Sequence, residues 1–280
     1  MANYDLHTHS TASDGVFKPA ELVSHARKAG VDVLALTDHD TLDGIAEAKA
    51  AAEELSIGLV AGVEISVTWE GYLFHIVGLG VDETDSRLLQ GLAGLRALRD
   101  RRALTMAQNL ERAGIPDPLA GAKKYQSTRV LSRTHFAHYL AEIGVVGSID
   151  DAFDQFLKPG KPGYAPTRWA SLREAVEWIN GAGGEAVIAH PGRYRLSEPE
   201  LHRFFGAFID TGGSAIEVVY SALQPASIER FAGYSRRYAL RASLGSDFHR
   251  PNTPRKLGRV GPLPDATIPV WQDRAWRHRA

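Results

Sequence analysis

The chain of 280 residues contains no cysteine. This absence excludes a disulfide-stapled scaffold, a thiolate zinc site and a cysteine nucleophile, and it fits a reducing cytoplasm. An excess of charge of one sign is lacking as well, because 32 lysines and arginines face 33 acidic residues. No overall basic field therefore predicts long nucleic acid or an anionic membrane surface as a partner.

Long apolar runs are also absent. No run approaches the roughly 20 residues that a helix needs to cross a bilayer, and residues 1–10 lack the basic and apolar regions of a signal peptide. We therefore expect a cytoplasmic protein without membrane attachment. The hydrophobic content of 44% and the charged content of 23% are typical of a globular protein. The length suits one large α/β domain, or a barrel with an inserted module.

Helical and strand-like patterns alternate over most of the chain. Helices are predicted over 19–30, 44–56, 172–182, 198–211 and 225–238, and strands over 31–37, 58–67, 73–79, 186–189, 215–219 and 242–245. Trp69-Glu70-Gly71 reads as a tight turn that pairs two of these strands. The alternation predicts an α/β fold with a parallel sheet, and chemistry at strand ends predicts a barrel with its active face on the loops that follow the strands.

The middle of the chain, about 86–164, shows helical periodicity and no convincing strand. A long helix to about residue 113 is followed by a break at 114–118 and by two further helices. We interpret 99–164 as a helical insertion that caps the active face of the barrel. The barrel then consists of 1–98 and 165–280, and the second part ends in a surface tail rich in proline and arginine.

His7 and His9 stand one residue apart in a short strand-like run, so their side chains point to the same face. Histidine and acidic residues recur at later strand ends, and this ligand set suits Mn²⁺, Fe²⁺ or Zn²⁺. Nine such side chains fit two or three divalent ions, with Mn²⁺ expected first and Glu64 as the bridging carboxylate. The predicted metal ligands are His7, His9, Asp14, His39, Glu64, His75, His190, Asp247 and His249.

Five motifs together resemble the PHP (polymerase and histidinol phosphatase) phosphoesterase family. The resemblance covers about 1–80 and 165–258. It is carried by His7-Thr8-His9-Ser10 with Ser13-Asp14-Gly15, Thr37-Asp38-His39-Asp40, Gly62-Val63-Glu64, Ala189-His190-Pro191 and Ser246-Asp247-Phe248-His249.

The resemblance implies a distorted (β/α)7 barrel with a site of two or three metal ions. It also implies how the ligands are shared among the ions. His7, His9, Glu64 and Asp247 would surround one ion, Asp14, His39 and His249 a second, and Glu64, His75 and His190 a third.

An amidohydrolase barrel also opens with a His-x-His strand, but it needs a bridging lysine in mid-chain. No lysine stands at a predicted strand end, since Lys123, Lys124, Lys158 and Lys161 all fall within the predicted insertion. The glutamate after the third strand, Glu64, favours the PHP family instead.

Clustered divalent ions activate water and clamp the oxygens of an in-line phosphoryl transfer. We therefore expect attack by a metal-activated hydroxide, with no covalent enzyme intermediate. Proton transfer is assigned to Asp247 first, with His39 and His249 as the other candidates. Substrate choice is expected to come from the insertion, because guanidinium groups bind phosphate in a bidentate fork. The predicted substrate-binding residues are Asp14, His39, Arg99, Arg102, Arg133, Thr134 and His135, and Tyr125, Tyr164 or Trp169 would either stack on a base or pack in the core.

A metal site for one phosphate beside a second basic subsite implies a substrate with two phosphates. Within the PHP family, the arginine-rich helix and Ser132-Arg133-Thr134-His135 resemble nucleoside 3′,5′-bisphosphate phosphatases, a group that includes enzymes trimming short RNA from the 5′ end. The resemblance implies hydrolysis of 3′-phosphoadenosine 5′-phosphate to AMP and phosphate. Three alternatives stay open: a 5′→3′ exoribonuclease of short oligoribonucleotides, a histidinol-phosphate phosphatase, and a non-catalytic metal-binding module. The expected partners are thus a small nucleotide or short RNA ends, with no protein partner.

Overall fold

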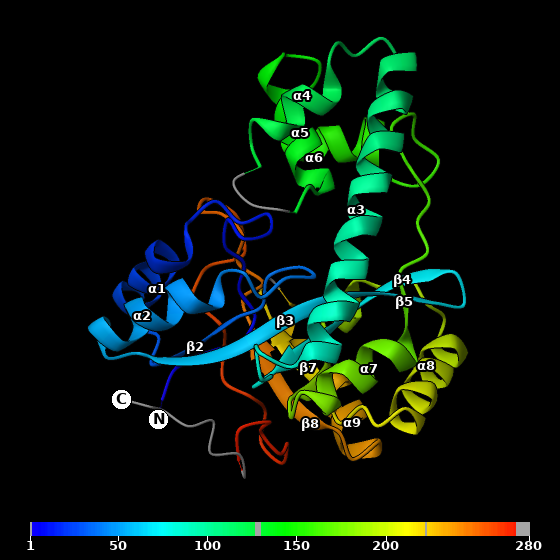
Figure 1. Ribbon diagram of the computed structural model, residues 1–280. Helices are drawn as coiled ribbons and strands as arrows, with labels where there is room; N and C mark the ends of the chain where they lie inside the picture. Colours follow the sequence, from blue (N-terminus) through cyan, green and yellow to red (C-terminus); the bar gives the residue numbers. More distant parts are fainter. Residues whose placement is uncertain (1, 127–129, 222, 273–280) are drawn as a thin grey trace.

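A computed structural model describes residues 2–126, 130–221 and 223–272 (Figure 1). Within these ranges, seven strands form a nearly closed, barrel-shaped sheet in the order β1-β2-β3-β4-β6-β7-β8. A hydrogen bond of 3.1 Å from Leu6 N to Leu244 O joins the two ends of this sheet. The predicted distorted barrel is confirmed. The strands are β1 (Tyr4–Asp5), β2 (Val33–Leu36), β3 (Gly58–Trp69), β4 (Tyr72–Leu79), β6 (Glu185–Ile188), β7 (Ala215–Tyr220) and β8 (Arg241–Gly245), and a short β5 (Ala170–Ser171) pairs with β3 outside the ring.

Strand β4 distorts the barrel, because it runs antiparallel to both of its neighbours, β3 and β6. The other neighbouring pairs of the ring are parallel, as predicted. The reversal occurs at Glu70 and Gly71, which both have positive φ angles, between the paired residues Trp69 and Tyr72. A connection this short can join only antiparallel strands. The tight turn predicted from the sequence is therefore what sets the direction of β4.

Helices cover the outside of the barrel (Figure 1). Helix α1 begins at a proline, the backbone N–H of Lys18 donates to Glu21 at 3.0 Å, and the chain leaves the helix through Gly30 with φ of 82°. Ser171 and Glu174 form a capping box at the start of α7. Each predicted helix of the barrel is present within two residues at either end. They are α1 (Pro19–Lys28), α2 (Ile45–Leu55), α7 (Leu172–Gly181), α8 (Glu198–Asp210) and α9 (Pro225–Arg237).

The C-terminal tail, predicted to lie on the surface, packs against the barrel as far as Trp271. The backbone N–H of Val270 donates to Ala242 O at 2.9 Å, and the Val270 side chain is buried in a cluster with strand residues such as Leu6. The ring of Trp271 stacks on Tyr4 at 4.1 Å between centroids. The tail therefore adds to the core of the barrel up to this point, and residues 273–280 of the predicted tail lie outside the described residues.

One long helix, α3 (Ser86–Arg112), carries the chain from the barrel into the predicted insertion (Figure 1). Its 27 residues span about 40 Å. Leu88 and Leu92 belong to the main core, whereas Met106 and Leu110 belong to a separate apolar cluster. The predicted boundary at residue 99 thus falls inside a continuous helix. None of the helices in the described ranges is long and apolar enough to cross a membrane.

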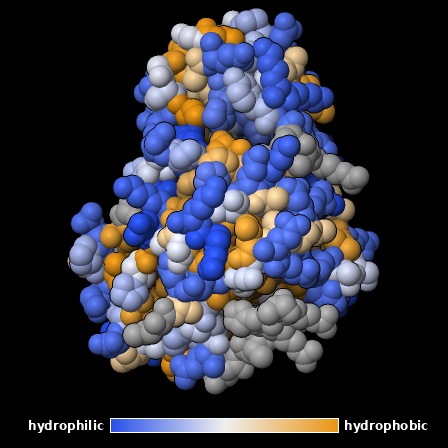
Figure 2. Space-filling model, turned by 90° about the vertical axis from the view of Figure 1, so that its left-hand side faces the viewer, coloured by the Kyte–Doolittle hydropathy of each residue, from blue (hydrophilic) through white to orange (hydrophobic). Residues whose placement is uncertain are grey.

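The rest of the insertion is more finely divided than predicted. In its described part, three short α-helices and a π-helical turn stand where two helices were expected, and a connection with Gly144 and Gly147 separates the second of these helices from the third. They are α4 (Pro118–Lys123), α5 (Arg133–Glu142), α6 (Ile149–Ala152) and η1 (Phe153–Leu157). We propose that residues 99–164 form a cap over the active face of the barrel, and we call this segment the cap. Figure 2 shows it as a narrower lobe on the barrel.

Candidate metal centre

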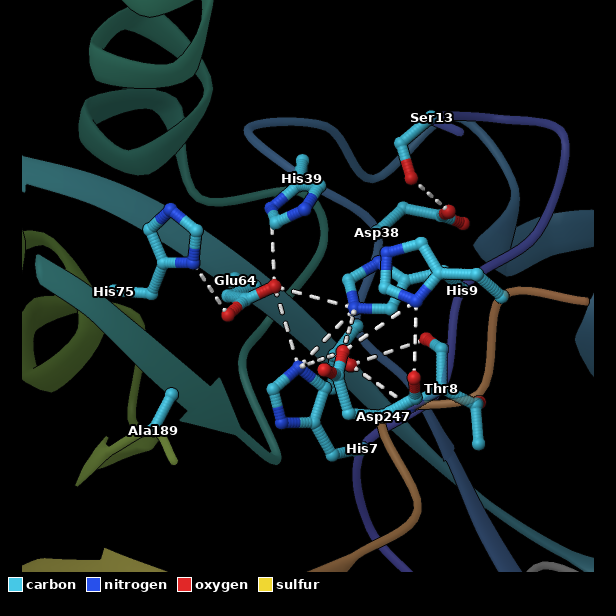
Figure 3. A network of polar contacts seen from close by, with 12 residues as sticks. His7, Thr8, His9, Ser13, Asp38, His39, Glu64, His75, Ala189 and Asp247 are labelled. Carbon is cyan, nitrogen blue, oxygen red and sulfur yellow. Dashed lines mark hydrogen bonds and ion pairs between the residues drawn. The ribbon is translucent and has the colours of Figure 1, made fainter. Parts of the chain in front are cut away.

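The nine predicted ligands converge beside the cap. Glu64, on β3, lies at the centre of this cluster, and imidazoles from several loops and from β4 point toward it (Figure 3). Its carboxylate oxygens contact His75 at 2.8 Å and His190 at 2.9 Å. Because these side chains come from residues 7 to 249 of the chain, only the closed barrel brings them together.

The first group of ligands is His7, His9, Glu64 and Asp247. All four residues are buried, and their potential ligand atoms lie within 4.8 Å of one another. His7 Nε2 and His9 Nε2 each lie 3.2 Å from Glu64 Oε2, and His9 Nε2 is also 3.2 Å from Asp247 Oδ1. This is the group that the resemblance implies for one ion.

Two further groups differ slightly from the implied distribution. Asp14, His39 and His249 come together as implied, but His9 joins them within 4.8 Å. His249 Nε2 lies 3.4 Å from Asp14 Oδ1. A third group combines Glu64 with His75, as implied, but contains His39 in place of His190. Since Glu64 takes part in two of the three groups, its position suits a bridging carboxylate.

The donor set fits divalent cations, as its unsatisfied atoms show. His9 Nδ1, Asp14 Oδ1, Glu64 Oε2 and His190 Nδ1 are buried without a hydrogen-bond partner among the described residues. Buried polar atoms without a partner are costly and rare in folded proteins. Imidazole and carboxylate atoms gathered in this way are the ligands that Mn²⁺, Fe²⁺ and Zn²⁺ prefer.

The electrostatics of the cluster also suit metal ligands. Burial lowers the pKa of His39 to about 4 and that of His190 to about 3, which keeps both imidazoles neutral. Burial would raise the pKa of Glu64, but neighbouring imidazoles, His39 first, hold it well below its usual range. For His9, burial lowers the pKa, but the contacts with the carboxylates of Asp247 and Glu64 outweigh this effect and raise it to about 9. The His9 imidazole must therefore lose a proton when a cation binds.

Glu217, on β7, is a buried supporting residue that the sequence analysis missed. Its Oε1 lies 2.6 Å from His7 Nδ1, and its Oε2 accepts a hydrogen bond from the backbone N–H of His190. The contact fixes the tautomer of His7, so that Nε2 is the atom that faces the ligand group. A lone carboxylate in the apolar strand 215–220 was the available signal in the sequence.

Two arginines that the sequence analysis also missed hold Asp247. Asp247 Oδ1 faces the histidines, while its Oδ2 contacts Arg193 and lies 3.2 Å from Arg255 Nη1. Burial would raise the pKa of Asp247, but the two guanidinium groups outweigh it and hold this pKa well below its usual range. These contacts favour Asp247 as a permanently ionised ligand and argue against its predicted role as proton acceptor. Arg193 could have been found beside His190-Pro191, whereas nothing in the tail marks Arg255.

A cavity of about 230 Å³ lies between the metal centre and the cap. The ligands line one side of it, and the cap contributes Arg99, Arg102, Arg133 and Thr134. Phe153 and Trp169 supply apolar walls. The predicted substrate-binding arginines therefore face the same space as the ligands.

The three cap arginines differ in their partners. Arg99 donates to Asp40 Oδ2 at 2.7 Å and to Ser66 Oγ at 2.9 Å, so its charge is balanced and it ties α3 to the barrel. Arg102 lies over the ring of Trp169 and Arg133 over the ring of Phe153, and neither makes an ion pair with a described residue. Burial, followed by the neighbouring Arg133 and Arg99, lowers the pKa of Arg102 well below its usual range. An anion between Arg102 and Arg133 would relieve this repulsion.

Two other residues predicted to contact substrate make hydrogen bonds within the protein. Thr134 Oγ1 donates to Asp14 Oδ2 at 3.0 Å. His135 is buried, and its Nδ1 accepts a hydrogen bond from Ser132 N at 2.9 Å, so it caps α5 and does not line the cavity. This position gives no support to the predicted phosphate contact of His135, which stays a prediction. Of the three aromatic residues considered for stacking, Trp169 lines the cavity, whereas Tyr125 and Tyr164 do not.

Comparisons with known proteins agree with this geometry. Among curated proteins, a 3′,5′-nucleoside bisphosphate phosphatase of Chromobacterium violaceum is 44% identical over 275 residues, which cover 98% of this chain and 96% of that one. A 5′-3′ exoribonuclease of Haemophilus influenzae is 43% identical over 269 residues, which cover 96% of this chain and 98% of that one.

A solved structure is equally close. It is described as an amidohydrolase from Chromobacterium violaceum with bound sulfate and no metal, and it matches with a TM-score of 0.93 and 43% identity. The match covers 97% of this chain and 95% of the other. The PHP domain pattern matches residues 5–189. Ligand cluster, barrel and relatives lead to one conclusion: the chain belongs to the PHP domain family.

Proposed function

We propose that the protein hydrolyses the 3′-phosphate of nucleoside 3′,5′-bisphosphates and releases a nucleoside 5′-phosphate and inorganic phosphate. The observation that carries this proposal is that Arg102 and Arg133, which make no ion pair with a described residue, lie in the same cavity as the metal ligands. One phosphate would lie at the ligands and the other between the arginines. The 44% identity to a 3′,5′-nucleoside bisphosphate phosphatase supports the assignment.

Each group of residues in the cavity has a proposed role in the reaction. Two or three divalent ions, with Mn²⁺ as the first candidate, would supply an activated water and neutralise the charge of the reacting phosphate. Arg193 and Arg255 keep Asp247 ionised and line the cavity, where they add positive charge beside that phosphate. His39 and His249 are the remaining candidates for proton transfer to the leaving oxygen, and Trp169 offers a face to the nucleoside.

A second candidate is 5′-3′ exoribonuclease action on short RNA, which the 43% identity to such an enzyme favours. Both reactions would use the same ligand cluster and the same arginines, and they differ in the leaving group. Histidinol phosphate is a poorer candidate, because its cationic end would approach the positive charges of Arg102 and Arg133, which no acidic residue of the described chain pairs with.

A kinetic comparison tests the proposal. The metal-loaded protein is assayed on adenosine 3′,5′-bisphosphate, on adenosine 3′-monophosphate and on a 5′-phosphorylated RNA of four nucleotides, with phosphate release and chromatography as readouts. We expect kcat/KM to be highest for the bisphosphate and about 100-fold lower for the monophosphate, which cannot use the arginine subsite. A higher kcat/KM for the RNA would replace the proposal by the exoribonuclease, and equal values for bisphosphate and monophosphate would overturn the second subsite.

The arginine subsite itself is tested by Arg133→Met and Arg102→Met. Each change removes a charge-assisted contact worth about 1.5–3 kcal/mol. We expect each to lower kcat/KM for the bisphosphate about 10- to 100-fold and to change that for the monophosphate less than about threefold. Arg101→Met is the control, because Arg101 is an exposed residue of α3, the helix that carries Arg102. This variant should change kcat/KM for neither substrate. Equal losses on both substrates would contradict the subsite.

A further inference from the structure

Asp14 is a predicted metal ligand whose carboxylate accepts hydrogen bonds from the cap. It lies in the loop after β1, and its Oδ1 is 3.4 Å from His249 Nε2 and has no hydrogen-bond partner among the described residues. Its Oδ2 accepts hydrogen bonds from two hydroxyls of the cap, Thr134 Oγ1 at 3.0 Å and Ser132 Oγ at 3.2 Å. One oxygen thus faces the ligand group, and the cap holds the other.

The barrel holds the backbone of the loop around Asp14, but no described hydroxyl of the barrel donates to the Asp14 carboxylate. Ser10 and Ser13 both donate to Asp38, and Gly15 N donates to Ser10 O at 2.9 Å. A side chain at Gly15 would clash with the backbone of His9, at 2.3 Å from its carbonyl oxygen. The loop is therefore tightly placed, yet within the described chain the hydroxyl donors to Asp14 come from the cap alone.

The cap in turn places these hydroxyls by its own packing. Phe136 and Leu140 of α5 are buried in the apolar cluster of the cap, which is separate from the barrel core. Ser132 Oγ accepts a hydrogen bond from Thr134 N at 3.1 Å, and His135 Nδ1 accepts from Ser132 N. The turn that presents both hydroxyls is thus held inside the cap.

The other carboxylate ligands do not depend on the cap in this way. Asp247 is held by Arg193, which follows β6, and by Arg255 of the tail. His7 is held by Glu217 of β7. Among the described residues, the supports named for His7 and Asp247 therefore belong to the barrel, whereas Asp14 receives its hydroxyl support from the insertion.

We propose that Thr134, with Ser132, is a positioning residue that makes the cation site of Asp14, His39 and His249 depend on the cap. The two hydroxyls stop the Asp14 carboxylate from rotating, so that Oδ1 stays directed at the cation. The site of His7, His9, Glu64 and Asp247 binds its ion without this help. The cap is then part of the metal centre as well as a wall of the cavity.

The test is a calorimetric titration of the metal-free full chain with Mn²⁺, combined with measured metal content. We expect Thr134→Val, which keeps the shape and removes the hydroxyl, to weaken one class of ion about 10- to 100-fold and to leave the others unchanged. Thr134→Ser restores the hydroxyl and should bind like the wild type. Thr105→Val is the matched control, because the exposed Thr105 donates to Arg101 O of its own helix and to no other described residue.

The melting temperature of each metal-free variant shows whether the change acts on the fold, and Thr134→Ala serves as the second variant if Thr134→Val does not fold. Asp14→Asn should weaken the same class of ion, and adding Thr134→Val to it should weaken that ion no further. An unchanged titration for Thr134→Val, or an equal weakening of all ions, would overturn the proposal. Because no nucleotide is present, the result is independent of the proposed substrate.

Discussion

Glu64→Gln is expected to lower kcat/KM for every phosphoester substrate at least about a thousandfold, which corresponds to about 4 kcal/mol of transition-state stabilisation. The two carboxylate oxygens of Glu64 lie between 2.8 and 3.2 Å from nitrogens of five histidines, His7, His9, His39, His75 and His190. Glutamine keeps the size of the side chain but removes the negative charge and places an N–H₂ group where an acceptor is required.

The matched control is Glu177→Gln, since Glu177 is an exposed residue of α7 that pairs with Arg173 at 3.8 Å. This variant should retain full activity and metal content. For Glu64→Gln, metal analysis should show the loss of at least one bound ion, and circular dichroism should show an intact fold. Retention of more than about a tenth of the activity with full metal content would mean that Glu64 does not bridge the ions.

Metal removal should have the second largest effect. A strong chelator is expected to abolish turnover, and Mn²⁺ at about a thousand times its Kd should stabilise the metal-free protein by about 4 kcal/mol. For a chain of this length, that corresponds to a rise in melting temperature of about 5–10 °C. The reason is that Glu64 and Asp14 carry buried oxygens without hydrogen-bond partners in the described chain, and a cation satisfies them.

Differential scanning fluorimetry with and without Mn²⁺ measures this shift, and Glu64→Gln is the control in which it should be much smaller. A melting temperature that does not change on chelation would show that the ions add nothing to stability. Turnover that survives exhaustive chelation would contradict metal dependence altogether.

Much of this centre follows from local rules. Side chains at i and i+2 share a strand face, which predicts that His7 and His9 meet. The turn at Glu70 and Gly71 pairs β3 with β4 so that Ser66 lies opposite His75, and His75 therefore comes close to Glu64. Chemistry at strand ends also predicted the barrel, because parallel strands present their ends on one face.

Other contacts of the site differ from those that the sequence predicted. Asp14 and Thr134 are 120 residues apart, and their contact depends on how the cap docks. Its position on the helix predicted that Arg99 binds phosphate, but Arg99 instead forms an ion pair with the buried Asp40. His135 belongs to a polar motif, but the start of α5 turns its Nδ1 back to Ser132 N. The first two contacts are tertiary and periodicity does not record them, whereas the contact between His135 and Ser132 is a local helix cap.

The central claim is that side chains from the whole length of the chain hold several cations side by side. Crystals grown with saturating Mn²⁺ and measured near the manganese absorption edge test it most directly. We expect anomalous peaks at two positions, one among His7, His9, Glu64 and Asp247 and one among Asp14, His39 and His249. An ordered cavity without anomalous density at either position would contradict it.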